Sequence, residues 1–204
     1  MEIGTLRWQV SVIWRWLPFA TITIIASAIL AYFVSSMLPS EYTSRVTLLV
    51  GPPLARQGVT LNDVLVGQAL LPTYAHLAIT RPFLERAIGR AGVDDTPEAL
   101  LSQVTTLVPE GQSVLELSVS RDDAAEAAEL ANAIANELAE YAREQNPDAD
   151  PPSFTVSVID PAVAADRADS PRVLFNTALA AGVSLLLVFA IGFLVENLRG
   201  EKAP

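Results

Sequence analysis

Residues 183–194 read Val-Ser-Leu-Leu-Leu-Val-Phe-Ala-Ile-Gly-Phe-Leu, which is apolar on every face of a helix. They lie within a charge-free run from Val173 to Val195. About 20 apolar residues in a helix match the hydrocarbon layer of a membrane, where the backbone must bond to itself. A soluble helix this close to a terminus would normally show a polar face. We therefore predict a transmembrane helix at 173–195 rather than a buried core helix.

A second charge-free run extends from Leu17 to Leu38, near the other end of the chain. Its apolar stretch exceeds the roughly 7 to 15 residues of a signal-peptide core, and Met37-Leu-Pro-Ser40 is a poor cleavage site. We predict a retained transmembrane helix at 17–38, with a cleaved signal peptide as the alternative. The hydrophobic fraction of 51% in 204 residues agrees with two such helices.

Basic residues that flank the two runs predict the orientation. Arg7 and Arg15 precede the first run, and Arg199 and Lys202 follow the second. Such cations tend to stay on the cytoplasmic side, whereas a long middle segment crosses regardless of its charge. The predicted organisation in the cytoplasmic (inner) membrane is a cytoplasmic N-terminus at 1–16, a helix at 17–38, an extracytoplasmic domain at 39–172, a helix at 173–195 and a short cytoplasmic tail at 196–204. Membrane lipid is then a partner of both helices.

The periodicity of the middle segment predicts an α+β fold. Alternating apolar and polar residues favour strands, and spacing at three to four residues favours helices. Strands are predicted at 42–50, 104–108, 114–120 and 154–159. Helices are predicted at 61–77, 83–91, 97–103 and 122–145. Taken together, the order strand, helix, strand, strand, helix, strand predicts a ferredoxin-like (split β-α-β) domain between the two transmembrane helices.

The charge and the side-chain chemistry exclude several classes of function. The chain carries 23 acidic and 13 basic residues, so a nucleic acid partner is excluded, because phosphate binding needs a basic face. With no cysteine there is no disulfide or thiolate metal site. The single His76 is expected to be a helix-face residue, and no glycine-rich phosphate loop is present.

Acidic residues give no catalytic or metal site in this sequence. The pairs Asp94-Asp95 and Asp122-Asp123 stand at helix starts, where capping and the helix dipole explain them. Asp148, Asp150 and Asp160 lie among loop prolines without a recognised calcium spacing. We therefore predict a protein that is not an enzyme, with no catalytic, cofactor-binding or metal-binding residues.

Several short motifs, taken in order, resemble those of the chain-length determinant (Wzz-type) polysaccharide co-polymerases. After the first span come Tyr42-Thr-Ser-Arg-Val-Thr-Leu-Leu-Val, Thr73-Tyr74-Ala-His-Leu-Ala, Glu116-Leu-Ser-Val, Asp122, Ala-Glu-Leu-Ala-Asn132-Ala-Ile-Ala-Asn136, Asp160-Pro-Ala and Ser170-Pro171. The motif positions are Tyr42, Tyr74, Asn132, Asn136, Pro161 and Pro171. The chain resembles a short form of this family without a fused tyrosine kinase domain.

The resemblance implies control of chain length or export for a capsule, exopolysaccharide or O-antigen (lipopolysaccharide) polymer. It also implies a ring-like homo-oligomer beside a membrane polysaccharide polymerase or flippase. The middle segment is short for the O-antigen type, and the proline-rich stretch is reduced to Pro161 and Pro171. Since the sequence ends at Pro204, an associated cytoplasmic tyrosine kinase is expected to be a separate chain that this one activates. The alternative is an extracytoplasmic ligand-sensing or adaptor protein that signals through its membrane helices.

Small residues on two predicted helices are candidates for close helix packing. One set is Ala127, Ala131, Ile134 and Leu138 on the helix at 122–145, and the other is Ala178 and Gly182 in the second span. Small side chains let helix backbones approach closely. Packing between the subunits of a homo-oligomer and packing within one chain are both open at this point.

Overall fold

The computed structural model describes residues 2–53, 58–145 and 154–200, and the chain divides into two compact units. We call Met1–Pro39 with Ser170–Pro204 the helix unit, and Ser40–Asp169 the module. The first and last parts of the chain thus form one unit, and everything between them forms the other.

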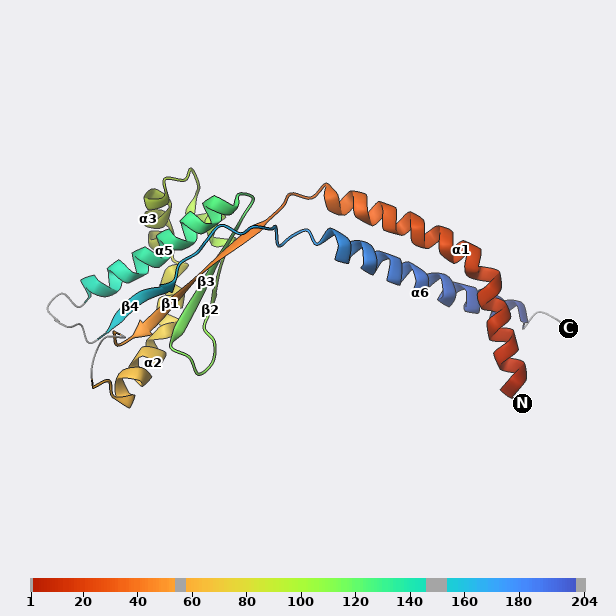
Figure 1. The fold of residues 1–204 in the computed structure, drawn as a ribbon, viewed down its shortest axis with the longest axis horizontal. Helices are drawn as coiled ribbons and strands as arrows, with labels where there is room; N and C mark the ends of the chain where they lie inside the picture. The colour runs from red at the N-terminus through yellow and green to blue at the C-terminus, as the bar shows by residue number, and fades with distance from the viewer. Residues whose placement is uncertain (1, 54–57, 146–153, 201–204) are drawn as a thin grey trace. The chain divides into compact units, whose positions relative to one another are not determined.

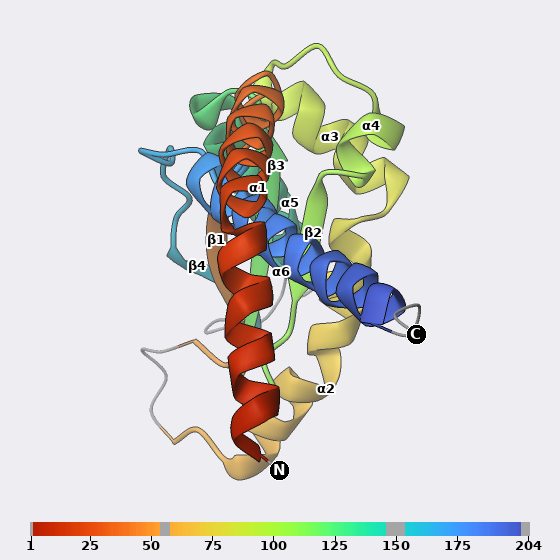
Figure 2. The same cartoon turned by 90° about the vertical axis from the view of Figure 1, so that its right-hand side faces the viewer.

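The helix unit consists of α1 (Glu2–Ser36) and α6 (Val173–Gly200), which run antiparallel beside each other (Figure 1). Two stretches, Trp14–Ser36 and Val173–Leu198, are long and apolar enough to cross a membrane. Helix α1 contains Pro18 and bends in its N-terminal half (Figures 1 and 2), as a proline that removes a helical hydrogen bond favours. Two apolar helices, one near each end of the chain, are therefore present as predicted.

The module is built on a four-stranded sheet with the order β2-β3-β1-β4. Its strands are β1 (Tyr42–Gly51), β2 (Val104–Leu107), β3 (Val114–Arg121) and β4 (Thr155–Asp160). All three neighbouring pairs are antiparallel, and in the central pair Val46 of β1 stands opposite Leu117 of β3. The predicted α+β class is confirmed by this antiparallel sheet and the helices that accompany it.

The two faces of the sheet differ as the alternation in the sequence predicts. Val46, Leu48 and Val50 are fully buried, whereas Arg45, which precedes them on the opposite face, is exposed. Leu115, Leu117 and Val119 continue the buried face on β3. Because successive side chains of a strand point to opposite faces, only one face of the sheet joins the core.

Four helices accompany the sheet, and their ends follow the capping signals of the sequence. They are α2 (Leu61–Ala78), α3 (Arg81–Ala91), α4 (Pro97–Leu101) and α5 (Ala124–Glu144). Thr96 accepts a hydrogen bond from the backbone of Ala99, and Gly92 ends α3 in the left-handed conformation. Asp123 caps α5 by accepting hydrogen bonds from two backbone amides. The predicted helices are confirmed, although α4 ends before the expected Gln103.

The small-residue stripe of α5 belongs to the module core. Ala127, Ala131, Ile134 and Leu138 each have 0% of their surface exposed. Helix α5 packs on β1, β3 and β4 and on its neighbour α3. These four side chains therefore pack within the module, and none of them is exposed on its surface.

Candidate functional site

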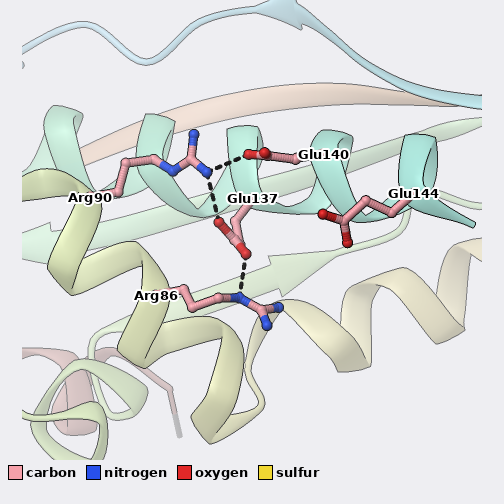
Figure 3. A pocket seen from close by; sticks show the side chains of 5 residues that line it. All are labelled: Arg86, Arg90, Glu137, Glu140 and Glu144. Atoms are coloured by element: carbon pink, nitrogen blue, oxygen red, sulfur yellow. Dashed lines mark hydrogen bonds and ion pairs between the residues drawn. The ribbon is translucent and has the colours of Figure 1, made fainter.

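A cluster of charged side chains joins α3 to α5 on the surface of the module (Figure 3). Arg86 of α3 pairs through its Nε with one carboxylate oxygen of Glu137, and Arg90 pairs with the other at 3.0 Å. The same Nη2 atom of Arg90 also bonds Glu140. The Glu137 side chain is only 10% exposed, while the two arginines are about half exposed. Glu137 therefore lies between the two guanidinium groups and is more buried than either arginine.

Helical spacing explains how these side chains meet. Arg86 and Arg90 are four residues apart on α3, so they project from one face. Glu137, Glu140 and Glu144 follow one another at three and four residues on α5. The guanidinium of Arg86 also lies 4.6 Å from the ring centre of Phe83, within cation–π range.

The charges of the cluster have opposite signs on the two helices. Hydrogen bonding to Glu140, followed by the hydrogen bond to Glu137, raises the pKa of Arg90, although partial desolvation acts against this rise. A buried carboxylate is tolerated when both of its oxygens are paired, as they are in Glu137. The cluster therefore holds α3 on α5 and presents fixed charges of both signs at the surface.

Two hollows lie along this helix pair, and together we call them the charged groove. One has a volume of about 350 Å³ and is lined by Arg86, Arg90, Glu137, Glu140 and Glu144. The other, of about 390 Å³, is lined by Arg90, Ala91, Glu129, Asn132, Ala133 and Asn136. Carboxylate, guanidinium and amide groups can hydrogen-bond a polar partner, so the chemistry of the groove suits binding.

Asn132 of α5 holds the segment that follows β4. Its amide nitrogen donates to the carbonyl oxygen of Ala162 at 2.9 Å, and the Ala162 N–H donates to its amide oxygen at 3.0 Å. The structure thereby brings together the Asn132 motif and the Asp160-Pro161-Ala162 motif. Asn136, one turn along α5, is exposed and lines the groove.

The remaining motif positions lie apart from the groove. Tyr74 of α2 is 7% exposed and stacks on Phe154, with ring centres 5.7 Å apart. Burial, and to a lesser degree Tyr141, raises the pKa of Tyr74. Tyr42 opens β1 opposite Arg121, and Pro171 lies in the helix unit. These positions have no shared site.

The histidine and the acidic side chains form no metal site in the part of the chain that the structure describes. His76 is exposed on α2, as expected for a helix-face residue. No group of three or more His, Asp or Glu side chains within 14–53, 58–145 and 154–198 is placed to hold a metal ion. Asp148 and Asp150 lie outside the described residues.

Polar contacts join the two long helices of the helix unit at several depths. Ser27 bonds Ser184 at 2.9 Å, and Asn176 donates to Ser35 at 2.9 Å. At one end of the pair, Arg15 and Glu196 form an ion pair at 3.4 Å. These pairs follow a single antiparallel register of α1 against α6.

The small residues of α6 divide between two faces. A β-carbon added at Gly192 would stand 2.9 Å from the Trp16 ring, so this glycine permits the contact with α1. Ala178 and Gly182 are exposed, and a β-carbon at Gly182 would meet nothing within 4 Å. The two predicted residues therefore face away from α1, and Gly192 was missed although Gly is a small residue of the same run.

The charged groove was also missed from the sequence. Arg86 and Arg90 share a helix face by their spacing, and Glu137 interrupts the apolar side of α5, which is a signal for a buried partner. Nothing in the linear sequence joins α3 to α5, because their contact arises only in the folded module, where α3 packs on α5.

Fold and site thus define a small α+β module enclosed in the sequence by two apolar helices. Two curated proteins are similar to the chain. The capsular polysaccharide biosynthesis protein CpsC of Streptococcus pneumoniae is 24% identical over 136 residues, which cover 66% of this chain and 59% of that protein. The probable capsular polysaccharide biosynthesis protein YwqC of Bacillus subtilis (strain 168) is 27% identical over 146 residues, covering 70% and 56%. No protein-family model matches the sequence.

These similarities confirm the predicted family resemblance. Both matched proteins carry names from capsular polysaccharide biosynthesis, the group to which the Wzz-type co-polymerase motifs pointed. The chain spans a little more than half the length of each. Neither is named as an enzyme, which is consistent with a role other than catalysis.

Proposed function

We propose that the protein acts in capsule-type polysaccharide biosynthesis as a membrane-anchored regulator of polymer chain length and export. The observation that carries this proposal is the combination of two apolar helices around an α+β module with the similarity to two capsular polysaccharide biosynthesis proteins. In this role the protein does not itself catalyse the formation of bonds in the polymer. It binds a membrane polysaccharide polymerase or flippase and determines how long a growing chain is retained.

The proposed membrane arrangement has the module outside the cytoplasm. Both termini are cytoplasmic, since Arg7, Arg15, Arg199 and Lys202 flank the two runs. The Arg15–Glu196 pair fits this placement, because a paired charge is tolerated at the end of a span. The strand order β2-β3-β1-β4 with antiparallel neighbours supports the ferredoxin-like interpretation of the module.

A homo-oligomeric scaffold is part of the proposal. Ala178 and Gly182 support it, because both are exposed on α6 and leave room for a helix of a second subunit. The buried α5 stripe plays no part in this contact. The mixed charges of the charged groove give the module a polar surface that suits a subunit or polymerase contact.

Deletion of the gene in its native host tests the function. We expect the size distribution of the surface polysaccharide on gels to broaden or shift, and complementation with the full chain to restore it. A module that lacks both spans should fail to restore the distribution, even when it is produced at the same level as the full chain. An unchanged distribution after deletion would contradict the proposal.

The deletion strain also tests two further roles, activation of a tyrosine kinase and sensing of an external ligand. Loss of phosphotyrosine from a cytoplasmic kinase in the deletion strain would support activation of a separate tyrosine kinase. An unchanged polymer together with a lost response to an external solute would instead favour the ligand-sensing alternative.

A further inference from the structure

The segment from Pro161 to Asp169, which we call the strap, joins β4 to the helix unit without forming a helix of its own. It is nevertheless tied to the module at three places. Asn132 bonds both backbone groups of Ala162, and the buried hydroxyl of Ser44 donates to the carbonyl oxygen of Val163 at 3.0 Å. Ser44 is 1% exposed, and Ala162 is 7% exposed and belongs to the core.

The third tie is a set of hydrogen bonds between the first and the last residues of the module. The backbone N–H of Asp169 donates to the carbonyl oxygen of Glu41 at 2.8 Å, and the Thr43 N–H donates to the Asp169 carboxylate at 3.2 Å. Glu41 is the second residue of the module, and Asp169 is its last. The module therefore holds its entrance and its exit side by side.

Among these ties, the one from α5 has a special position. A single side-chain amide satisfies both the N–H and the C=O of Ala162, in the way a neighbouring strand would. Asn132 also lines the charged groove, so a partner that contacts the groove lies next to this tie. The strap continues directly into the residues before α6, so the segment that Asn132 holds leads to the second apolar helix.

We propose that Asn132 is a positioning residue, which couples α5 and the charged groove to the strap and so to the approach of the chain to α6. The proposal rests on the proposed function, since it gives the scaffold a path from its surface to its membrane helices. The physical requirement is that both hydrogen bonds to Ala162 hold while the module is folded.

Amide hydrogen exchange of the full chain in lipid nanodiscs tests the tie directly. We expect Asn132→Ala to raise exchange over 161–169 by about tenfold or more, because a buried amide loses its acceptor. Asn132→Asp keeps the shape but turns a carboxylate oxygen instead of an N–H donor toward the carbonyl oxygen of Ala162, and the repulsion between these oxygens should open the tie and raise exchange as well. If Asn132→Ala fails to fold, the Asn132→Asp variant alone tests whether Asn132 fixes the strap. The matched control, Gln145→Ala, removes an exposed amide at the end of the same helix that lines neither hollow of the charged groove, and it should exchange as the wild type does.

Polysaccharide length in cells carrying the same variants tests the positioning role. We expect both Asn132 variants to shift the length distribution while their unfolding midpoints stay close to that of Gln145→Ala. The Gln145→Ala control should give a wild-type distribution. Unchanged exchange over 161–169 would overturn the tie, and faster exchange with wild-type polymer would overturn the coupling. If deletion of the gene itself leaves the polymer unchanged, the proposed function fails, while the exchange result still decides whether Asn132 fixes the strap.

Discussion

Gly67 of α2 lies against the backbone of Val50 at the end of β1, where an added β-carbon would stand 2.7 Å from the Val50 carbonyl oxygen. Backbone at this distance cannot give way as a flexible side chain can. We therefore expect Gly67→Ala to destabilise the module by about 1 to 3 kcal/mol, because α2 must move off the sheet. The measurement is denaturant unfolding of the full chain in detergent.

Gly89 of α3 supplies the matched control for this substitution. A β-carbon there would meet nothing within 4 Å. Gly89→Ala should therefore stabilise the chain by about 0.5 to 1 kcal/mol, since alanine loses less backbone entropy in a helix. Equal effects of the two substitutions would contradict the close approach of α2 to β1.

The ion pairs of Glu137 give a second prediction. Glu137→Ala should destabilise the module by about 1 to 2 kcal/mol, because two charged hydrogen bonds are lost but both arginines remain accessible to water. Glu144→Ala removes an exposed carboxylate from the same helix and should change stability by less than about 0.5 kcal/mol. Thermal unfolding of both variants in low and high salt measures the difference, which should shrink as salt screens the exposed part of the cluster.

A third prediction concerns stability at alkaline pH. Burial raises the pKa of Tyr74 above its ordinary value of 10.0, so the folded state favours the neutral phenol. This contribution is fully present below pH 10 and is lost as the pH rises through the higher folded pKa. Tyr74→Phe keeps the ring on Phe154 and should reduce the loss of stability above pH 10.

The measurement is the denaturant midpoint at several values between pH 8 and about 11.5. Tyr42→Phe is the control for removal of a phenol from the module. A wild-type pH dependence in Tyr74→Phe would show that ionisation of Tyr74 is not coupled to unfolding.

Gly182 and Gly192 of α6 give a fourth prediction, which separates contacts within a chain from contacts between chains. Gly192→Leu should force α6 away from Trp16 and loosen the helix pair, whereas Gly182→Leu should leave that pair intact. If Ala178 and Gly182 form the subunit contact, Gly182→Leu alone should lower the oligomeric state. Mass measurement in nanodiscs and disulfide trapping between introduced cysteines at residues 27 and 184 distinguish the two effects. If Gly182→Leu assembles as the wild type does, the face of α6 with Ala178 and Gly182 is not the subunit contact.

Most of the fold could be predicted from the sequence because its signals are local. The alternation of Tyr42–Val50 reports which side chains are buried, and Thr96-Pro97 and Gly92 mark the ends of helices within a few residues. The apolar runs at both ends are equally local, since they depend on length and composition alone.

The site could not be predicted because it depends on contacts between distant segments. Glu137 meets Arg86 and Arg90 only after α3 and α5 have packed together, and Asn132 meets Ala162 only after β4 has joined the sheet. The pattern of small residues was ambiguous for the same reason. It marks close packing on α5 and α6 alike, and only the burial of Ala131 and the exposure of Gly182 distinguish the core from the surface.

The location of the module is tested most directly by labelling introduced cysteines, since the natural chain contains none. Gln112→Cys provides an exposed thiol in the loop between β2 and β3, and Lys202→Cys provides one in the predicted cytoplasmic tail. In intact spheroplasts, a membrane-impermeant maleimide should label residue 112 at once and residue 202 only after the membrane is opened. Protection of residue 112 until the membrane is opened would place the module in the cytoplasm and contradict the account.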